Sequence, residues 1–227
     1  MLVTMPLQSA LTNYYARRAK EYEEIYQRPE RQEDLQTLRQ RMTKTLAGKD
    51  VLEIACGTGY WTEVLSHFAS SITATDINDQ MLAIARAKEL EPRVVTLAQA
   101  DAYALPGFRR HFNAGLAGFW WSHVPKSRLP GFLHDFHRNF LPGSTIMFFD
   151  NVFVEGSSAP ISRRDSEGNT WQQRRLRDGT THEVPKNFPT REEILEALCG
   201  IATEISLDFL KYYWVLTYTA HTGERLG

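Results

Sequence analysis

Hydrophobic positions along the chain alternate between two patterns. Short apolar runs rich in β-branched residues predict buried strands, and apolar residues three or four positions apart predict helices. Strands that alternate with helices form βαβ units, so we expect an α/β fold with a doubly wound, mostly parallel sheet. The predicted strands cover residues 51–55, 71–75, 93–98, 112–119 and 144–154. The predicted helices between them begin at Trp61 and cover residues 81–90 and 128–140.

Two polar regions interrupt this alternation. Residues 1–47 have helical spacing, which Pro29 should divide into two helices. Residues 155–188 form a polar insert after the fifth strand that is rich in arginine. Within it, Asp178-Gly179 lies between two strand-like runs and predicts a β-hairpin.

The last part of the chain breaks the pattern in another way. Thr190 and Glu193 form a capping box at the start of a predicted helix. Residues 201–210 and 211–220 then follow as two adjoining strands with no helix between them. Strands joined by so short a connection should be antiparallel.

A glycine turn, Glu53-Ile54-Ala55-Cys56-Gly57-Thr58-Gly59, follows the first predicted strand. Glycines let the backbone approach a ligand closely, and the next helix directs its N–H groups toward that ligand. The third glycine of a dinucleotide-binding pattern is missing, because position 62 is a threonine. Glu53 also suits a cationic ligand group better than a pyrophosphate.

Carboxylates follow the next two predicted strands. Asp76 ends the second strand, where a carboxylate can accept hydrogen bonds from both ribose hydroxyls of a nucleoside. Asp101 follows the third strand, where it could accept a hydrogen bond from an adenine amino group. Together with the glycine turn, these residues indicate a nucleoside site at the ends of the strands.

The ordered segments VLEIACGTG, TATDIN, AQADA and FNAGLAGF resemble the class I S-adenosylmethionine-dependent methyltransferases. The resemblance covers residues 45–220 and implies a Rossmann-like methyltransferase fold with seven strands, a reversed final strand and S-adenosylmethionine as the cofactor. The residues that we expect around the cofactor are Tyr22, Glu53, Ala55, Gly57, Thr58, Gly59, Trp61, Asp76, Ile77, Met81, Asp101, Ala102 and Phe119.

The fourth predicted strand leads into Phe119-Trp120-Trp121-Ser122-His123-Val124-Pro125. The Asn/Asp-Pro-Pro-Tyr signature of the enzymes that methylate amino groups of nucleic acids is absent. The Ser-His-x-Pro form resembles small-molecule methyltransferases instead. His123 is the candidate catalytic residue, and three roles stay open: a general base, a group that orients the acceptor, or a residue that holds the loop.

Residues for the methyl acceptor are expected in the N-terminal helix and in the insert. Tyr14, Arg18 and Tyr22 share one helix face, which favours a lid, although they could simply pack on the sheet. In the hairpin, Arg174 shares a face with Leu176, which should turn toward the domain. The alternative is that these cations form a solvated surface. The candidate acceptor-binding residues are Tyr14, Arg18, Trp120, His123, Arg164, Arg174 and Lys186.

The length of 227 residues and a hydrophobic content of 42% fit one globular domain over residues 1–227. We divide it into a helical lid (1–47), a cofactor-binding core (48–154), a substrate insert (155–188) and a C-terminal part with the last helix and two antiparallel strands (189–227). The formal net charge of -1 disfavours nucleic acid and anionic membranes as partners, so a small molecule is the expected partner.

Cysteine content and hydropathy suggest where the protein works. Two cysteines are too few for a disulfide framework or a thiolate zinc site, and we expect no metal. There is neither an apolar run of membrane-spanning length nor the pattern of a signal peptide. These observations predict a cytoplasmic protein, which we expect to be a monomer or a homodimer.

The predicted function is methyl transfer from S-adenosylmethionine to an anionic oxygen, a carboxylate or a phosphonate, of a small molecule. The arginine-bearing insert motivates this choice, and the insert together with residues 119–125 resembles enzymes that O-methylate such compounds. One alternative is an N-methyltransferase acting on a small heterocycle or amine. Others are a nicotinamide-dependent oxidoreductase on a related fold and a cofactor-binding protein without catalysis.

Overall fold

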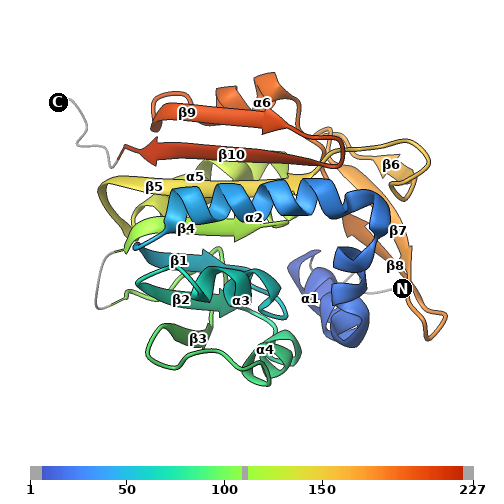
Figure 1. Cartoon of the computed structure of the whole chain (residues 1–227). Helices are drawn as coiled ribbons and strands as arrows, with labels where there is room; N and C mark the ends of the chain where they lie inside the picture. Colours follow the sequence, from blue (N-terminus) through green and yellow to red (C-terminus); the bar gives the residue numbers. More distant parts are fainter. Residues whose placement is uncertain (1–6, 109–111, 222–227) are drawn as a thin grey trace.

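A computed structural model describes residues 7–108 and 112–221 and is built on a seven-stranded sheet (Figure 1). The strand order is β3-β2-β1-β4-β5-β10-β9, in which β10 is antiparallel to both neighbours and the pairs from β3 to β5 are parallel. The mostly parallel sheet with one reversed strand is therefore confirmed. The strands are β1 (Asp50–Ile54), β2 (Ser71–Asp76), β3 (Val95–Gln99), β4 (Phe112–Gly118), β5 (Phe140–Asn151), β9 (Ala202–Phe209) and β10 (Tyr213–Ala220).

Helices cover both faces of this sheet and create two separate cores (Figure 1). Because side chains alternate along a strand, Met147 and Phe149 of β5 face one core while Ile146 and Phe148 face the other. Helices α2 and α3 contribute to the first core, and α5 and α6 to the second. The helices are α1 (Leu7–Arg18), α2 (Gln32–Leu46), α3 (Tyr60–Ser66), α4 (Asp79–Arg86), α5 (Leu129–His137) and α6 (Arg191–Ala197), with 3₁₀ segments η1 (Ala19–Gln27), η2 (Pro29–Arg31), η3 (Trp121–His123) and η4 (Lys126–Arg128).

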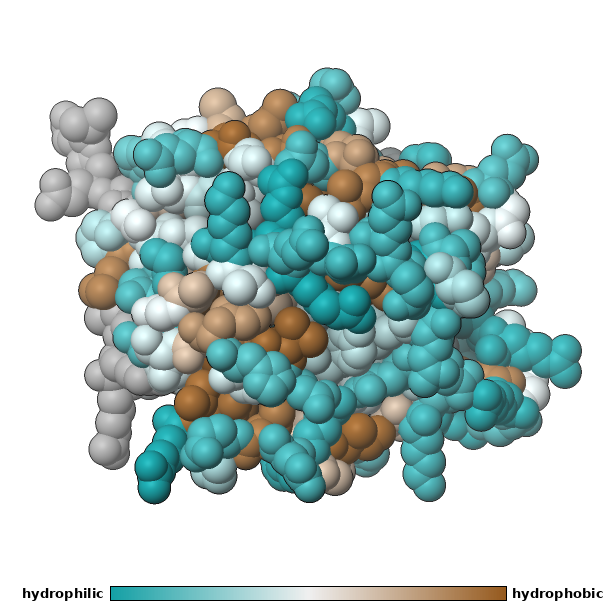
Figure 2. All heavy atoms as spheres, in the orientation of Figure 1, coloured by the Kyte–Doolittle hydropathy of each residue, from teal (hydrophilic) through white to brown (hydrophobic). Residues whose placement is uncertain are grey.

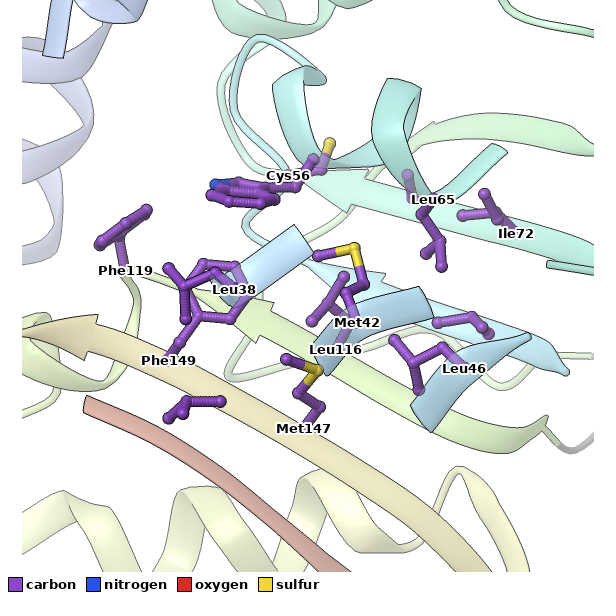
Figure 3. Packing of buried hydrophobic residues seen from close by; sticks show 14 of the residues in the cluster. Leu38, Met42, Leu46, Cys56, Leu65, Ile72, Leu116, Phe119, Met147 and Phe149 are labelled. Atoms are coloured by element: carbon purple, nitrogen blue, oxygen red, sulfur yellow. The ribbon is translucent and has the colours of Figure 1, made fainter. Parts of the chain in front are cut away.

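The expected division of the N-terminal helices at Pro29 is confirmed, but α2 is not part of a lid. Its apolar side chains are fully buried, and Leu38, Met42 and Leu46 point toward the sheet, where Leu116 and Met147 lie (Figure 3). A helix that buries a whole apolar stripe in this way belongs to the core. Only α1 and η1 remain as a cover, and residues 1–6 of the expected lid lie outside the described residues.

The insert after β5 forms its own small antiparallel sheet in the order β6-β7-β8. Strands β7 (Thr170–Arg175) and β8 (Thr181–Pro185) are the predicted hairpin around Asp178-Gly179, and β6 (Ile161–Arg164) is an additional edge strand. Helix α1 packs against β8, so the N-terminal cover and the insert lie side by side next to the main sheet (Figure 1). This arrangement places two polar segments around the ends of the central strands.

Strand β5 begins earlier than its apolar pattern indicates. Residues 141–144, which lie between the predicted helix and the predicted strand, form an irregularity within β5, because Phe112 of β4 pairs with Phe140 and Ala114 already pairs with Thr145. Extra residues on one strand are accommodated as a bulge. The following run from Ser144 to Asn151 agrees with the expected strand, which was predicted to continue to residue 154.

Candidate functional site

The carboxyl ends of β1, β2, β3 and β4 meet at a cavity that α1 covers. In this sheet order the crossover direction reverses between β1 and β4, which is where open α/β sheets bind ligands. We call this space the glycine-turn cavity. Its wall consists of Gln8, Leu11, Thr12, Tyr15, Tyr22, Ala55, Gly57, Asp76, Ile77, Asn78, Met81, Ala100, Asp101, Ala102, Gly118, Phe119, Trp120 and His123.

The glycine turn and the end of β2 are joined through Asp76. Its carboxylate accepts hydrogen bonds from the backbone N–H of Gly57 at 2.9 Å and of Asn78 at 2.8 Å. Gly57 has a φ of 58°, which a residue with a side chain rarely adopts, so the turn needs glycine here. The carboxylate keeps acceptor capacity for a ligand, and burial raises the pKa of Asp76.

Two residues without the freedom of glycine also have a left-handed backbone in this wall. They are Ala55, with a φ of 51°, and Phe119, with a φ of 60°. Both follow directly after a central strand, β1 and β4 respectively. Backbone strain of this kind costs on the order of 1–3 kcal/mol and clusters at ligand sites.

Helix α1 is attached to this cavity by two hydrogen bonds. The amide of Gln8 donates to a carboxylate oxygen of Asp101 at 2.5 Å, and the amide of Asn78 donates to the backbone oxygen of Thr12 at 2.8 Å. The other oxygen of Asp101 accepts from the N–H of Tyr103. A ligand that bonds to Asp101 therefore competes with Gln8.

Four residues expected around the cofactor do not line this cavity. The carboxyl group of Glu53 lies behind the turn, where Thr62 donates to it at 2.7 Å, and burial raises its pKa to about 8. Gly59 begins α3 in close contact with Ala85, and the ring of Trp61 packs in the core. Thr58 is also buried away from the wall.

A second cavity of about 310 Å³ lies between η1, η2 and the insert, and we call it the arginine cavity. Its wall contains five cationic side chains, and no aspartate or glutamate lines it in the part of the chain that the structure describes. Figure 2 shows mostly hydrophilic residues at the right of the view, where α1 and the insert lie in Figure 1. The cationic residues are Arg18, Arg28, Arg31, Arg174 and Lys186.

Lys186 differs from the four arginines because its charge is balanced. Its ammonium group lies 2.8 Å from a carboxylate oxygen of Asp150 and donates to the hydroxyl of Ser122 at 2.6 Å. Both charged side chains are almost completely buried. Burial lowers the pKa of Lys186, and the ammonium group of Lys186 keeps the pKa of Asp150 below its ordinary value.

Within residues 7–108 and 112–221, the structure shows no carboxylate paired with Arg18 or Arg174. Arg18 donates to the hydroxyl of Tyr14 at 3.0 Å and lies over the ring of Tyr22. Arg174 donates to the amide oxygen of Gln172 at 2.5 Å, and burial lowers its pKa. Arg174 thus faces the cavity, as the alternation along β7 predicts.

Arg164 is the one expected acceptor-binding residue that lies elsewhere. It is exposed on β6, lines neither of the two cavities, and donates to the backbone oxygen of Gly168. The expected placement is wrong because β6 is an edge strand turned to solvent, with all four of its residues exposed. Arg164 and Arg174 are close in the sequence, but only Arg174 lines the arginine cavity.

Four aromatic side chains line both cavities and form their junction: Tyr15, Tyr22, Phe119 and His123. The Nδ1 of His123 lies 2.7 Å from the backbone oxygen of Pro185 and must donate to it, so in a neutral ring Nε2 is the acceptor. The hydroxyl of Tyr15 then donates to Nε2 across 2.7 Å. Burial and the nearby Lys186 lower the pKa of His123 to about 3, so the ring is neutral at pH 7.

Several residues of the two walls are absent from the sequence-based expectations. Tyr15 has helical neighbours on both sides and no signal in the sequence that separates it from Tyr14. Arg28 and Arg31 lie next to the predicted break at Pro29, in a segment that sequence alone assigns to a helix. The other residues that were missed are Gln8, Leu11, Thr12, Ile25, Asn78, Ala100, Gly118, Asn151, Ser157, Ser158, Ala159, Gln172, Val184, Phe188 and Tyr213.

Comparisons with known proteins agree with this geometry. Residues 51–143 match the family model of a methyltransferase domain. The demethylmenaquinone methyltransferase of Staphylococcus aureus (strain MRSA252) is 30% identical over 115 residues, which are 48% of this chain and 47% of that protein. The ubiquinone biosynthesis O-methyltransferase of Azotobacter vinelandii is 31% identical over 108 residues, 45% of this chain and 44% of that protein. The chain spans about half the length of these curated relatives.

Solved structures match over nearly the whole chain. A DhpI–SAH complex has a TM-score of 0.79 and 27% identity and covers 96% of this chain and 98% of its own. A DhpI–SAM–HEP complex has a TM-score of 0.77 and 27% identity and covers 95% of this chain and 99% of its own. The fold and the strand-end site define a Rossmann-like methyltransferase. The chain belongs to the class I S-adenosylmethionine-dependent methyltransferases.

The glycine-turn cavity fits this cofactor. The carboxylate of Asp76 lines the cavity and accepts only backbone N–H bonds from the described residues, which leaves it able to accept from a ligand as well. A side chain at Gly57 would project toward Met81, whose methyl group lies 3.7 Å from the position of a Cβ. Asp76 and Asp101 offer carboxylate acceptors for hydroxyl and amino groups.

Proposed function

We propose that this methyltransferase transfers the methyl group of S-adenosylmethionine to an anionic oxygen of a small molecule, a carboxylate or a phosphonate. The observation that carries the proposal is the arginine cavity, in which four arginines adjoin the cofactor site and none of the described wall residues carries a carboxylate. Arginine is suited to such acceptors because its planar fork can bond two oxygens of one anion. The match to DhpI, which was solved as a complex with SAM and HEP, supports a site in this fold that binds SAM together with a second molecule.

The cofactor would occupy the glycine-turn cavity. Asp76 would accept hydrogen bonds from ribose hydroxyls, and Asp101 would accept one from the adenine amino group after Gln8 withdraws from it. Ala55, Gly57, Ile77, Met81 and Ala102 would form the surrounding wall. The bound cofactor supplies a methyl group that its positive sulfur has already activated.

The acceptor would lie in the arginine cavity with its reacting oxygen at the junction. Arg174 and Arg18 would hold the anion, while Lys186 contributes little net charge because of Asp150. A carboxylate or phosphonate oxygen is ionised at pH 7, so no general base is needed. We infer that His123, neutral and bonded at both ring nitrogens, orients Tyr15 rather than removing a proton.

An ammonium or amine acceptor is disfavoured by the same wall, because a positive charge there would be repelled by four arginines.

The cellular location belongs to the proposal as well. No helix among the described residues is long and apolar enough to cross a membrane. Both cysteines, Cys56 and Cys199, are free thiols, which fits a reducing cytoplasm.

The experiment is a transfer assay with S-adenosylmethionine that is labelled in its methyl group. Small alkylphosphonates and alkylcarboxylates are compared with alkylamines of the same chain length, and products are identified by mass spectrometry. We expect methyl esters from the anionic compounds and no methylated amine. Methylation of the amines alone would contradict the proposal.

A further inference from the structure

The arginine cavity has a second cationic group on another wall. Arg31, from η2, donates to the hydroxyl of Ser157 at 3.1 Å, and its guanidinium group lies 5.6 Å from the ring centre of Tyr213. Arg28 lines the same wall, and its side chain is exposed. Arg28 and Arg31 come from the segment around Pro29, and Ser157 comes from the loop after β5. Arg174, in contrast, comes from β7.

The two groups have different neighbours. Arg18, Arg174 and Lys186 act on one another electrostatically and surround Tyr15 and His123 at the junction with the glycine-turn cavity. Arg31 instead contacts the start of β10 through Tyr212 and Tyr213. Arg28 is near both, because its charge affects the pKa of Arg174 and that of Tyr213.

Arg31 keeps an unused hydrogen-bond donor in this wall. Its Nε is buried, and none of the described residues accepts a hydrogen bond from it. Its other two nitrogens reach only the hydroxyls of Ser157 and Tyr213, the latter at 3.5 Å. The guanidinium group of Arg31 thus donates only to neutral hydroxyls among the described residues, and an anion in the cavity would give it a charged partner.

The charge of the cavity exceeds what one anionic group can balance. Of the five cations, Lys186 is neutralised by Asp150, which leaves four arginine charges. One phosphonate carries at most two negative charges and one carboxylate carries one. At least two arginines would therefore stay unbalanced in a partly buried site, which is unfavourable.

We propose that the acceptor carries two anionic groups, and that Arg31 and Arg28, with the hydroxyl of Ser157, bind the group that is not methylated. This inference rests on the proposed function and defines its substrate class: a short dianionic or trianionic molecule with a carboxylate at one end and a phosphonate or carboxylate at the other. The first anion is held by Arg174 and Arg18 at the junction. The second then selects the substrate and sets its orientation.

The test compares matched pairs of acceptors at saturating S-adenosylmethionine. The probes are phosphonoacetate, 3-phosphonopropionate and 4-phosphonobutyrate, each against the alkylphosphonate of the same carbon chain without the carboxylate. We expect at least one carboxylated probe to have a KM at least tenfold lower than its partner. Equal KM values within every pair would overturn the inference while leaving the proposed function intact, and no methylation of any probe would overturn the proposed function itself.

Variants show whether Arg31 and Arg28 cause this preference. Arg28→Gln and Arg31→Gln should each raise the KM of the preferred carboxylated probe about tenfold and change the KM of its alkylphosphonate partner less than threefold. Arg28→Gln is the more secure variant, because its exposed side chain makes none of the contacts that Arg31 makes with the fold. Arg175→Gln, an exposed arginine outside the cavity, is the control. Equal effects on both members of a pair would assign the two arginines a structural or general electrostatic role and overturn the inference.

Discussion

The two cavities that meet at the aromatic junction are built in opposite ways. The glycine-turn cavity is formed at the ends of neighbouring parallel strands, and its charged groups are the carboxylates of Asp76 and Asp101. The arginine cavity is formed by segments added around that sheet, and its charged groups are cations. The first depends on the fold itself, whereas the second depends on side chains that the fold only brings together.

This difference indicates a division of tasks. Changes in the glycine-turn cavity should affect the cofactor and the stability of the turn, because Asp76 is bonded to the backbone there. Changes among the arginines should affect the acceptor and leave cofactor binding intact. The one exception in the arginine cavity is the buried pair of Lys186 and Asp150, which we expect to affect folding.

The largest effect is expected from the buried pair of Lys186 and Asp150. Lys186→Met leaves the carboxylate of Asp150 buried without its partner, which should lower the free energy of unfolding by about 3–5 kcal/mol. Urea unfolding at pH 7 measures the loss. The control is Arg163→Met, which breaks an exposed pair with Glu183 and should cost about 1 kcal/mol or less. If Lys186→Met lowered the free energy of unfolding by only about 1 kcal/mol or less, as expected for Arg163→Met, the buried pair would not be essential for stability.

Next in size is the loss of Asp76. Asp76→Ala removes two charge-assisted hydrogen bonds to the cofactor, each about 1.5 kcal/mol, so the affinity for S-adenosylmethionine should fall at least about 100-fold. The bonds to Gly57 and Asn78 are lost as well, so the melting temperature should also decrease. Calorimetric titration measures the affinity, with Asp79→Ala on the exposed side of α4 as the control. An unchanged affinity in a folded variant would refute the role of Asp76.

A smaller and more selective effect is expected for Arg174. Arg174→Ala should reduce kcat/KM for an anionic acceptor about 30-fold, since one bidentate contact of about 2 kcal/mol is lost, and should leave the affinity for S-adenosylmethionine unchanged. Arg174→Lys should recover little of the activity because it lacks the fork. Arg175→Ala, the exposed neighbour on β7, should behave like the wild type. If both alanine variants reduced activity by less than twofold, the cations would be a solvated surface.

Two buried groups beside the cavities, Glu53 behind the glycine turn and His123 at the junction, should respond to pH with opposite sign. Glu53 has a pKa of about 8 in the folded protein, so its contribution to stability is present below pH 4.5 and is lost as the pH rises toward 8. His123 has a pKa of about 3, so its contribution is present above pH 6.5 and is lost as the pH falls toward 3. Urea unfolding at several pH values gives the slope of the free energy of unfolding against pH. Glu53→Gln and His123→Asn should change this slope in opposite directions, by about 1.4 kcal/mol per pH unit each. Slopes that change in the same direction would contradict these assignments.

The sequence predicts the sheet and most of the glycine-turn cavity for a physical reason. Each of its key residues, Gly57, Asp76 and Asp101, lies at the end of a strand or within three residues after it. The apolar pattern of these strands is visible, and parallel strands bring their carboxyl ends together. Side-chain direction is harder to predict next to a turn. Glu53 is therefore found behind the turn, bonded to Thr62, although its neighbour Ala55 lines the wall.

The arginine cavity is only partly predictable because its residues are distant in the sequence and lie outside the main sheet. Alternation along one hairpin strand is sufficient to place Arg174. It does not place Arg164, because the pairing of β6 at the edge of the small sheet is not visible in the sequence. Arg31 reaches the cavity through contacts with Ser157 and Tyr213, which no local pattern reveals.

The most direct test of the two-cavity account is a crystal structure of the protein with the demethylated cofactor product and 3-phosphonopropionate. We predict the nucleoside in the glycine-turn cavity, with its ribose hydroxyls on Asp76, and the acceptor in the arginine cavity. One phosphonate oxygen should face Tyr15 and the sulfur of the product, with Arg174 bonded to the same group. An acceptor bound outside the arginine cavity, or a ribose that does not contact Asp76, would contradict the account.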